Sequence, residues 1–183
     1  MTPRTSDFNR RAAHYDDNRW QRLFFEPVHS GLLAALAGDL VPHRVLDVGC
    51  GTGRLLERLA RSWPEAEMIG VDPAPGMVEV ARAKHQGDAR FRFEIAAAEE
   101  LPFSDATFDL ALSTVSFHHW SNPLRGLREV ARVIRPGARL FLADAYPGGV
   151  LRLLAPVIGR LRGSATVPPK SCASSWPRPA SWY

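Results

Sequence analysis

Residues 45–53 read VLDVGCGTG: an apolar run comes first, and glycine then occupies every second position. The segment that follows, LLERLA at residues 55–60, has its apolar residues at helical spacing. Together the two segments predict a buried strand, a tight turn and a helix. Because glycine has no Cβ, the backbone of such a turn can come close to a ligand at the carboxyl end of the strand. The turn is therefore a candidate binding loop for a nucleotide-type ligand.

The placement of charge around this loop separates two kinds of ligand. A dinucleotide loop has the spacing G-x-G-x-x-G and holds a pyrophosphate at a helix N-terminus, whereas this loop reads G-x-G-x-G. Asp47 stands two residues before the first glycine, where it would repel a pyrophosphate. A ligand with an ammonium, a sulfonium and no phosphate would be attracted instead. S-adenosylmethionine (SAM) is such a ligand.

Two later segments extend this pattern. Residues 68–72, MIGVD, predict a strand that ends in an acid about twenty-five residues after Asp47, near the spacing at which an acid holds ribose hydroxyls. Residues 99–109 read EELPFSDATFD. The chain resembles the class I SAM-dependent methyltransferases: VLDVGCGTG is similar to their motif I, and residues 99–109 are similar to the A-E-x-L-P-F-x-D-x-x-F-D signature of the type 11 methyltransferase domain. The similarity runs from about residue 11 to about residue 163, and that branch includes methyltransferases of ubiquinone and menaquinone biosynthesis.

Strand and helix patterns alternate along the chain. Such alternation predicts an α/β fold with a doubly wound, mainly parallel sheet, and the resemblance implies the Rossmann-like form of it. The ligand of such a sheet lies beyond the carboxyl ends of the strands, where the strand order reverses. We expect five strands, with the family's last two missing. The expected strands are residues 44–48, 67–71, 91–95, 108–113 and 139–144, and the expected helices are residues 20–37, 54–62, 76–84, 125–134 and 149–161.

Three regions are predicted. Residues 1–38 form an N-terminal helical cap, which contains AAHYD at 12–16, similar to an A-x-x-Y-D element of the family; residues 39–163 form the SAM-binding core. Residues 164–183 are rich in proline and lack apolar periodicity, so they predict an irregular, non-native tail. A disordered tail is one interpretation. A C-terminal truncation or frameshift near residues 163–165, or a sequencing error, is the other, because the shifted frame permits an amphipathic helix and the start of a strand. Loss of the last two strands would expose strand five and impair activity.

Composition excludes several classes of protein. The 183 residues fit one domain, and a net charge of +4 with scattered Arg residues implies no nucleic-acid surface. Cys50 and Cys172 are too few for a disulfide framework or a metal site, which fits a reducing cytoplasm. We expect no signal peptide, because the first residues lack an early apolar run, and the sequence has no run of the roughly 18 apolar residues that cross a bilayer. We expect a soluble cytoplasmic protein without stable membrane insertion, and its oligomeric state stays open.

The strand ends and the resemblance together give the candidate SAM ligands. Asp72 is the expected ribose ligand, and Met77 is expected to cover the adenine unless it is ordinary core filling. The family usually has an acid for the adenine amino group where this chain has Ala97, a loss of roughly 1 kcal/mol, and the Ala98 backbone would meet the adenine edge instead. The full candidate set is Asp47, Gly49, Cys50, Gly51, Gly53, Asp72, Met77, Ala98, Glu99 and Ser113.

The acceptor side is less well defined by the sequence. Methyl transfer needs alignment and exclusion of water, and a general base only when the acceptor must lose a proton early. Tyr15, Phe117 and His118 are candidates for the acceptor pocket, and His118 is a weak candidate base that packing at the strand end would equally explain. The sequence identifies no other catalytic residue. The aromatic residues Trp20, Phe24, Phe25, Phe117 and Trp120 are expected to line this pocket or to belong to the core.

Residues 113–117, STVSF, narrow the class of acceptor. They lack the Asn/Asp-Pro-Pro-aromatic run of methyltransferases that act on nucleic-acid amino groups, and Ser113 offers no carboxylate to hold magnesium. We therefore expect a SAM-dependent methyltransferase with no metal and a small-molecule acceptor, apolar or quinone-like. The alternative is a non-catalytic remnant of the fold that acts as a binding protein.

Overall fold

One sheet organises the molecule. The computed structural model describes residues 3–16, 19–36, 38, 40–144 and 152–153. Within them the strand order is β3-β2-β1-β4-β5-β6, and the first five strands in the chain run parallel. The order reverses beside β1, which pairs with β2 on one side and β4 on the other, so the predicted doubly wound α/β fold is confirmed. The strands are β1 (Arg44–Val48), β2 (Glu67–Asp72), β3 (Phe91–Ile95), β4 (Phe108–Thr114), β5 (Ile134–Asp144) and β6 (Arg152–Leu153).

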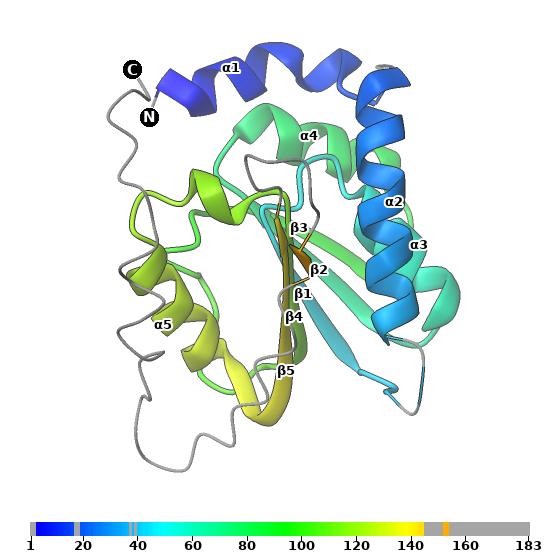
Figure 1. The fold of residues 1–183 in the computed structure, drawn as a ribbon, viewed down its shortest axis with the longest axis vertical. Coiled ribbons are helices and arrows are strands. Elements are labelled where there is room, and N and C mark those ends of the chain that lie inside the picture. The colour runs from blue at the N-terminus through cyan, green and yellow to red at the C-terminus, as the bar shows by residue number, and fades with distance from the viewer. Residues whose placement is uncertain (1–2, 17–18, 37, 39, 145–151, 154–183) are drawn as a thin grey trace.

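Helices cover both faces of this sheet. Figure 1 shows α2 and α3 on one side and α5 on the other, while α1 lies beside α4 at one end of the sheet. The helical elements are α1 (Pro3–Arg11), the 3-10 turn η1 (Ala12–His14), α2 (Arg19–Leu36), α3 (Arg54–Ser62), α4 (Pro75–Lys84), the 3-10 turn η2 (Phe117–His119) and α5 (Pro123–Val133). Among the described residues, none of these helices combines the length and apolar character that a bilayer crossing requires.

Alternation along β1 builds a separate core on each face. Val45 packs in one cluster with residues of α2 and α3, including Leu32 and Leu56, while Leu46 packs in the other cluster with Val130 of α5. All of these side chains are buried, and each fully buried Leu contributes on the order of 1.5–3 kcal/mol. The two cores fix the sheet between its helices and hold the carboxyl ends of the strands in register.

The signature segment at residues 99–109 connects α5, β4 and β1 through hydrogen bonds. Arg132 of α5 donates to the carbonyls of Leu101 (3.0 Å) and Phe103 (2.7 Å). Asp109, near the start of β4, accepts from the backbone N–H groups of His43 (2.8 Å) and Arg44 (2.9 Å) at the start of β1. These contacts give much of the segment a structural role. The contacts of Asp109 lie at the amino ends of β1 and β4, away from the carboxyl ends of the strands.

The C-terminal part of the sheet differs from the prediction. β5 begins at Ile134 rather than at the predicted residue 139, and its pairing with β4 shifts register between Phe108 and Leu110. The helix predicted over residues 149–161 is wrong at Arg152–Leu153, which pair antiparallel with β5 as β6. The physical reason is that the edge of β5 offers unpaired backbone groups. The rest of that predicted helix, and the tail at residues 164–183, lie outside the described residues.

Candidate functional site

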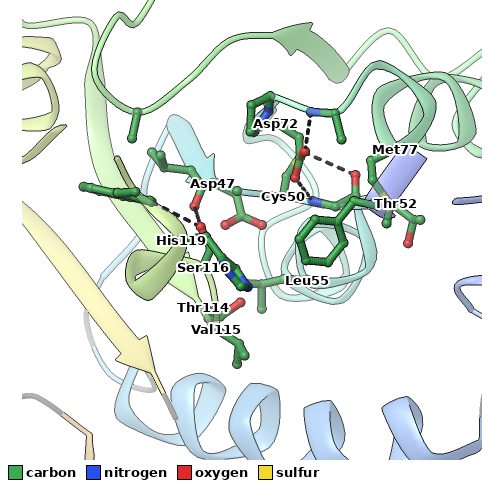
Figure 2. A pocket seen from close by; sticks show the side chains of 18 of the residues that line it. Asp47, Cys50, Thr52, Leu55, Asp72, Met77, Thr114, Val115, Ser116 and His119 are labelled. Carbon is green, nitrogen blue, oxygen red and sulfur yellow. Dashed lines mark hydrogen bonds between the residues drawn. The ribbon is translucent and has the colours of Figure 1, made fainter. Parts of the chain in front are cut away.

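A cavity of about 350 Å³ lies beyond the carboxyl ends of β1, β2 and β4, at the point where the strand order reverses. Its wall combines the glycine loop, the ends of β2 and β4, the loop after β3 and aromatic side chains from α1, η1 and α2. Figure 2 shows Asp47, Asp72, Met77, Ser116 and His119 around this one space. The topology alone predicts a ligand site at this edge of the sheet.

The glycine loop requires left-handed backbone at each of its glycines. The φ angles are +82° at Gly49, +53° at Gly51 and +81° at Gly53, which disfavour other residues. A Cβ on Gly49 would also lie 1.8 Å from the hydroxyl oxygen of Ser116. Gly49, Gly51 and Cys50 line the cavity, but Gly53 does not: it is the N-cap residue of α3. Gly49 therefore lets Ser116 approach the loop, whereas the space beside Gly51, where a Cβ would meet nothing within 4 Å, is open to a ligand.

Asp72 fastens this loop to the end of β2. Its carboxylate accepts from the N–H groups of Gly51 (3.0 Å) and Ala74 (2.9 Å), as Figure 2 shows. Burial raises the pKa of Asp72, and the two backbone hydrogen bonds oppose that shift. Each carboxylate oxygen has a second lone pair, so Asp72 can still accept from ligand hydroxyls in the cavity that it lines.

Asp47 is a buried acid with an unsatisfied oxygen. The residue is 1% exposed and lines the cavity, and its Oδ1 has no hydrogen-bond partner among the described residues. Burial raises the pKa of Asp47 to about 7, and the nearby charge of Asp72 adds to this effect. An ionised carboxylate in this position is costly unless a cation or a hydrogen-bond donor reaches it. The arrangement thus favours a ligand with a positive charge or N–H donors at this point.

The loop after β3 closes another part of the wall. Ala97, Ala98 and Glu99 all line the cavity, together with Met77 of α4, which is 2% exposed and packs in a small cluster with Ala12 and Ala74. The carboxylate of Glu99 accepts from the N–H of Asn122 at 2.7 Å. This side of the cavity is mainly apolar, and Ala97 contributes no charge to it.

The loop after β4 approaches the glycine loop. Thr114, Val115 and Ser116 line the cavity, whereas Ser113 does not: it is 1% exposed, and its Oγ has no partner in the part of the chain that the structure describes. Ser116 donates to the carbonyl of Val48 at 3.1 Å and accepts from the indole N–H of Trp120 at 3.3 Å. Val115 has a φ of +52°, a strained conformation for a β-branched residue. This strain places Ser116 against Gly49.

Two predicted acceptor-pocket residues lie outside the wall of the cavity. In η2 the Nδ1 of His118 lies 2.7 Å from the carboxylate of Asp144, whose other oxygen accepts the His118 backbone N–H at 2.8 Å. These two bonds hold the His118 side chain at the end of β5, so its assignment to the pocket is wrong, and Phe117 packs edge-on against Trp120 at 5.0 Å. His119, whose ring lies 3.8 Å from that of His118, lines the cavity instead.

The predicted aromatic residues divide in the same way. Tyr15, Phe25 and Trp120 line the cavity. The side chains of Trp20 and Phe24 lie outside the described part of the chain. His29 and Arg54 also lie in the wall but were not predicted from the sequence. His29 lies within the apolar pattern of α2, between the buried residues Val28 and Leu32, and that pattern alone predicts packing. For His29, the only available signal was a polar histidine within the apolar face of a predicted helix.

The described N-terminal elements are fastened over the cavity. The hydroxyl of Thr52 does not cap α3 but donates to Asp16 at 2.8 Å, and Lys84 of α4 forms an ion pair with the same carboxylate. Asn9 of α1 accepts from the N–H of Gly76 at 2.7 Å. These bonds connect α1 and η1 to the glycine loop and to both ends of α4, so Phe8 and Tyr15 become part of the wall.

The sequence is similar to a known protein family and to several of its members. Residues 46–142 match a family model described as a methyltransferase domain, of type 11. An uncharacterized methyltransferase of Bacillus subtilis is 39% identical over 141 residues, which cover 76% of this chain and 54% of the relative. The demethylmenaquinone methyltransferase of Deinococcus radiodurans is 34% identical over 160 residues, which cover 84% of this chain and 63% of the relative. The chain thus spans between about half and two thirds of the length of these relatives.

A solved structure shares the fold. The crystal structure of a SAM-dependent methyltransferase from Aquifex aeolicus matches with a TM-score of 0.58 and 28% identity, over 63% of each chain.

Proposed function

Since the chain belongs to the type 11 methyltransferase domain family of class I SAM-dependent methyltransferases, we propose that it binds SAM in the cavity at the end of the sheet and transfers its methyl group to a small molecule. The observation that carries this proposal is the unsatisfied Oδ1 of Asp47, 1% exposed and bordering the cavity. The phosphates of a dinucleotide would repel the buried carboxylate and raise the free-energy cost of its charge, whereas the ammonium of SAM would pair with it and lower that cost.

The cavity residues fit this ligand in three places. Asp47 and the backbone of Gly49 and Gly51 hold the amino-acid end. Asp72 accepts the ribose hydroxyls, with its orientation fixed by the N–H groups of Gly51 and Ala74. Met77 and the backbone of Ala98 meet the adenine, and Cys50 and Glu99 complete the wall.

Two of the sequence candidates take other roles. Gly53 starts α3, and Ser113 belongs to the buried part of β4. Neither is among the residues that line the cavity. We assign both to the structure that supports the loop rather than to ligand contact.

When bound, SAM supplies a methyl carbon that its sulfonium has already activated. The protein then has to position the acceptor and exclude water from it. The fastened N-terminal elements exclude water, with Asp16 bound to Thr52 at 2.8 Å and Asn9 bound to Gly76 at 2.7 Å. His119 and Tyr15 are the polar aromatic residues on the acceptor side, and His118 acts indirectly as a positioning residue, because Asp144 fixes it beside the ring of His119.

In this proposal the methyl acceptor is a small molecule. The wall that Phe8, Phe25 and Trp120 contribute favours an apolar compound. A relative named demethylmenaquinone methyltransferase, 34% identical over 84% of this chain, supports a quinone-like acceptor as one member of that class. The division into a cap at residues 1–38 and a SAM-binding core at residues 39–163 is part of the same proposal.

The rival function is a binding protein that retains the SAM site without catalysis. Incubation of the chain with methyl-labelled SAM and a small-molecule metabolite extract separates the two functions. We expect S-adenosylhomocysteine to form only when the extract is present, and labelled methyl to appear in the organic phase. Binding of SAM without any extract-dependent turnover would favour the binding protein.

A further inference from the structure

Five aromatic rings form a continuous row along the cavity wall. The ring centroids are 5.3 Å apart from His119 to Phe8, 6.4 Å from Phe8 to Tyr15, 6.4 Å from Tyr15 to Phe25 and 6.0 Å from Phe25 to His29. All five residues line the cavity, and four of them come from α1, α2 and the end of η1. Rings at such spacings offer faces and edges to a further flat ring.

His29 ends this row, and its Nδ1 makes no hydrogen bond with any residue that the structure describes. It is 5% exposed, and its Nδ1 is buried without a partner. The nearby side chains of Arg54 and Arg58 are directed to another partner, because both form ion pairs with Glu26, at 3.1 Å and 2.6 Å. A leucine would fill the same space without burying an unsatisfied nitrogen, so a core-packing role alone does not account for a histidine here.

The surroundings keep this imidazole neutral. Burial lowers the pKa of His29 to about 4, and the charges of Arg58 and Arg54 lower it further while Glu26 opposes them. A neutral imidazole has one N–H donor and one acceptor nitrogen, so it can bind a hydroxyl or a carbonyl oxygen. It makes no ion pair, and therefore it does not select for a charged acceptor.

On the basis of the proposed function, we infer that the methyl acceptor is a planar aromatic compound with a hydroxyl or carbonyl oxygen, which lies among the five rings and is hydrogen-bonded by His29. The rings select for flatness, and His29 selects for the oxygen. The proposed SAM contacts Asp47, Asp72 and Met77 line the same cavity, and Phe8 and Tyr15 pack against the cluster that contains Met77. His29 is not in that cluster, so the selection for the oxygen can be tested by changing His29 while the proposed SAM contacts are kept.

Equilibrium dialysis with three probes tests this inference in the full chain saturated with S-adenosylhomocysteine. The probes are 2-naphthol, naphthalene and 2-decalol, which keep or remove the oxygen and the aromatic ring in turn. We expect 2-naphthol to bind at least tenfold more tightly than either of the others. His29→Phe should weaken 2-naphthol about tenfold and leave naphthalene within twofold, whereas His29→Gln should keep most of the affinity for 2-naphthol.

A matched control and a separate readout keep the outcomes apart. His43→Phe changes an exposed histidine at the opposite end of the sheet and should leave all three affinities unchanged. Calorimetry of S-adenosylhomocysteine with each variant checks that the fold and the proposed SAM site are intact. Equal binding of the three probes, or no response to His29→Phe while S-adenosylhomocysteine still binds, would overturn the inference alone. Failure of the wild-type chain to bind S-adenosylhomocysteine would overturn the proposed function together with it.

Discussion

Asp47 and Asp72 lie at the carboxyl ends of neighbouring strands, but their surroundings differ. Asp72 accepts two backbone N–H groups, while the Oδ1 of Asp47 has no partner. The sequence predicted both acids at the site from their spacing, but it did not predict this difference, because it arises from the path of the loop between them. In the same way it predicted His118 rather than His119, since the direction of each ring in a 3-10 turn depends on Asp144, 26 positions away.

Asp72→Ala is expected to weaken SAM binding at least tenfold. The change removes the proposed ribose acceptor and also the partner of the Gly51 and Ala74 N–H groups, so both contact and loop geometry are lost. Titration calorimetry measures the affinity. Asp105→Ala, which removes a largely exposed acid paired with Arg132, is the control and should bind SAM like the wild type. Equal affinity of Asp72→Ala and the wild type would refute the assignment.

Asp47→Asn is expected to stabilise the chain without ligand at pH 8 but not near pH 4. Burial raises the folded-state pKa of Asp47 to about 7, above its value in the unfolded chain. The folded state therefore binds the proton more tightly, and stability falls as pH rises from about 4 to 7, by on the order of a few kcal/mol. Urea unfolding of both proteins from pH 4 to 8 tests this. A difference that stays constant across that range would mean that Asp47 does not titrate there.

Gly49→Ala is expected to lower the free energy of unfolding by about 2 kcal/mol or more, because it combines a φ of +82° with a Cβ 1.8 Å from the Ser116 hydroxyl. Ser116→Gly in the same chain should recover part of the loss, since the clash involves the Ser116 side chain. Gly87→Ala, with a φ of +93° and no atom within 4 Å of the added Cβ, isolates the backbone strain and should cost about 1 kcal/mol. Equal losses for Gly49→Ala and Gly87→Ala in urea unfolding would show that the contact with Ser116 is unimportant.

At the scale of elements, strands were predicted more closely than connections. β3 has the predicted bounds, and α3 does as well, because each has a strong apolar period of its own. β5 starts earlier than predicted because pairing with Phe108 extends a segment whose Pro136 and Gly137 locally favour a turn. β6 and η2 depend on contacts with the end of β5, which no local pattern records.

Asp109→Ala is expected to destabilise the junction of β1 and β4 by about 1–3 kcal/mol, because two backbone N–H groups lose their acceptor and Arg135 loses its partner. SAM affinity should change less than twofold, since this junction lies at the amino ends of the strands. Urea unfolding and calorimetry give the two values. A large loss of affinity with unchanged stability would instead place the signature acid in the functional site.

At the scale of the whole molecule, the sequence predicted the sheet, its order reversal and the edge where the cavity lies. Those features follow from the alternation of strands and helices and from the rule on strand ends. It did not predict how Asp16, Thr52 and Lys84 hold the N-terminal elements over the cavity, because these three side chains meet only in the folded chain. The frameshifted or truncated tail predicted for residues 164–183 lies outside the described residues and stays a prediction.

Calorimetric titration of the wild-type chain with SAM tests the central claim most directly. We expect one SAM to bind per chain, S-adenosylhomocysteine to compete with it and NAD to have no effect, because the acid at residue 47 favours an ammonium and repels a pyrophosphate. Absence of SAM binding by the folded chain, or tighter binding of NAD than of SAM, would contradict the account.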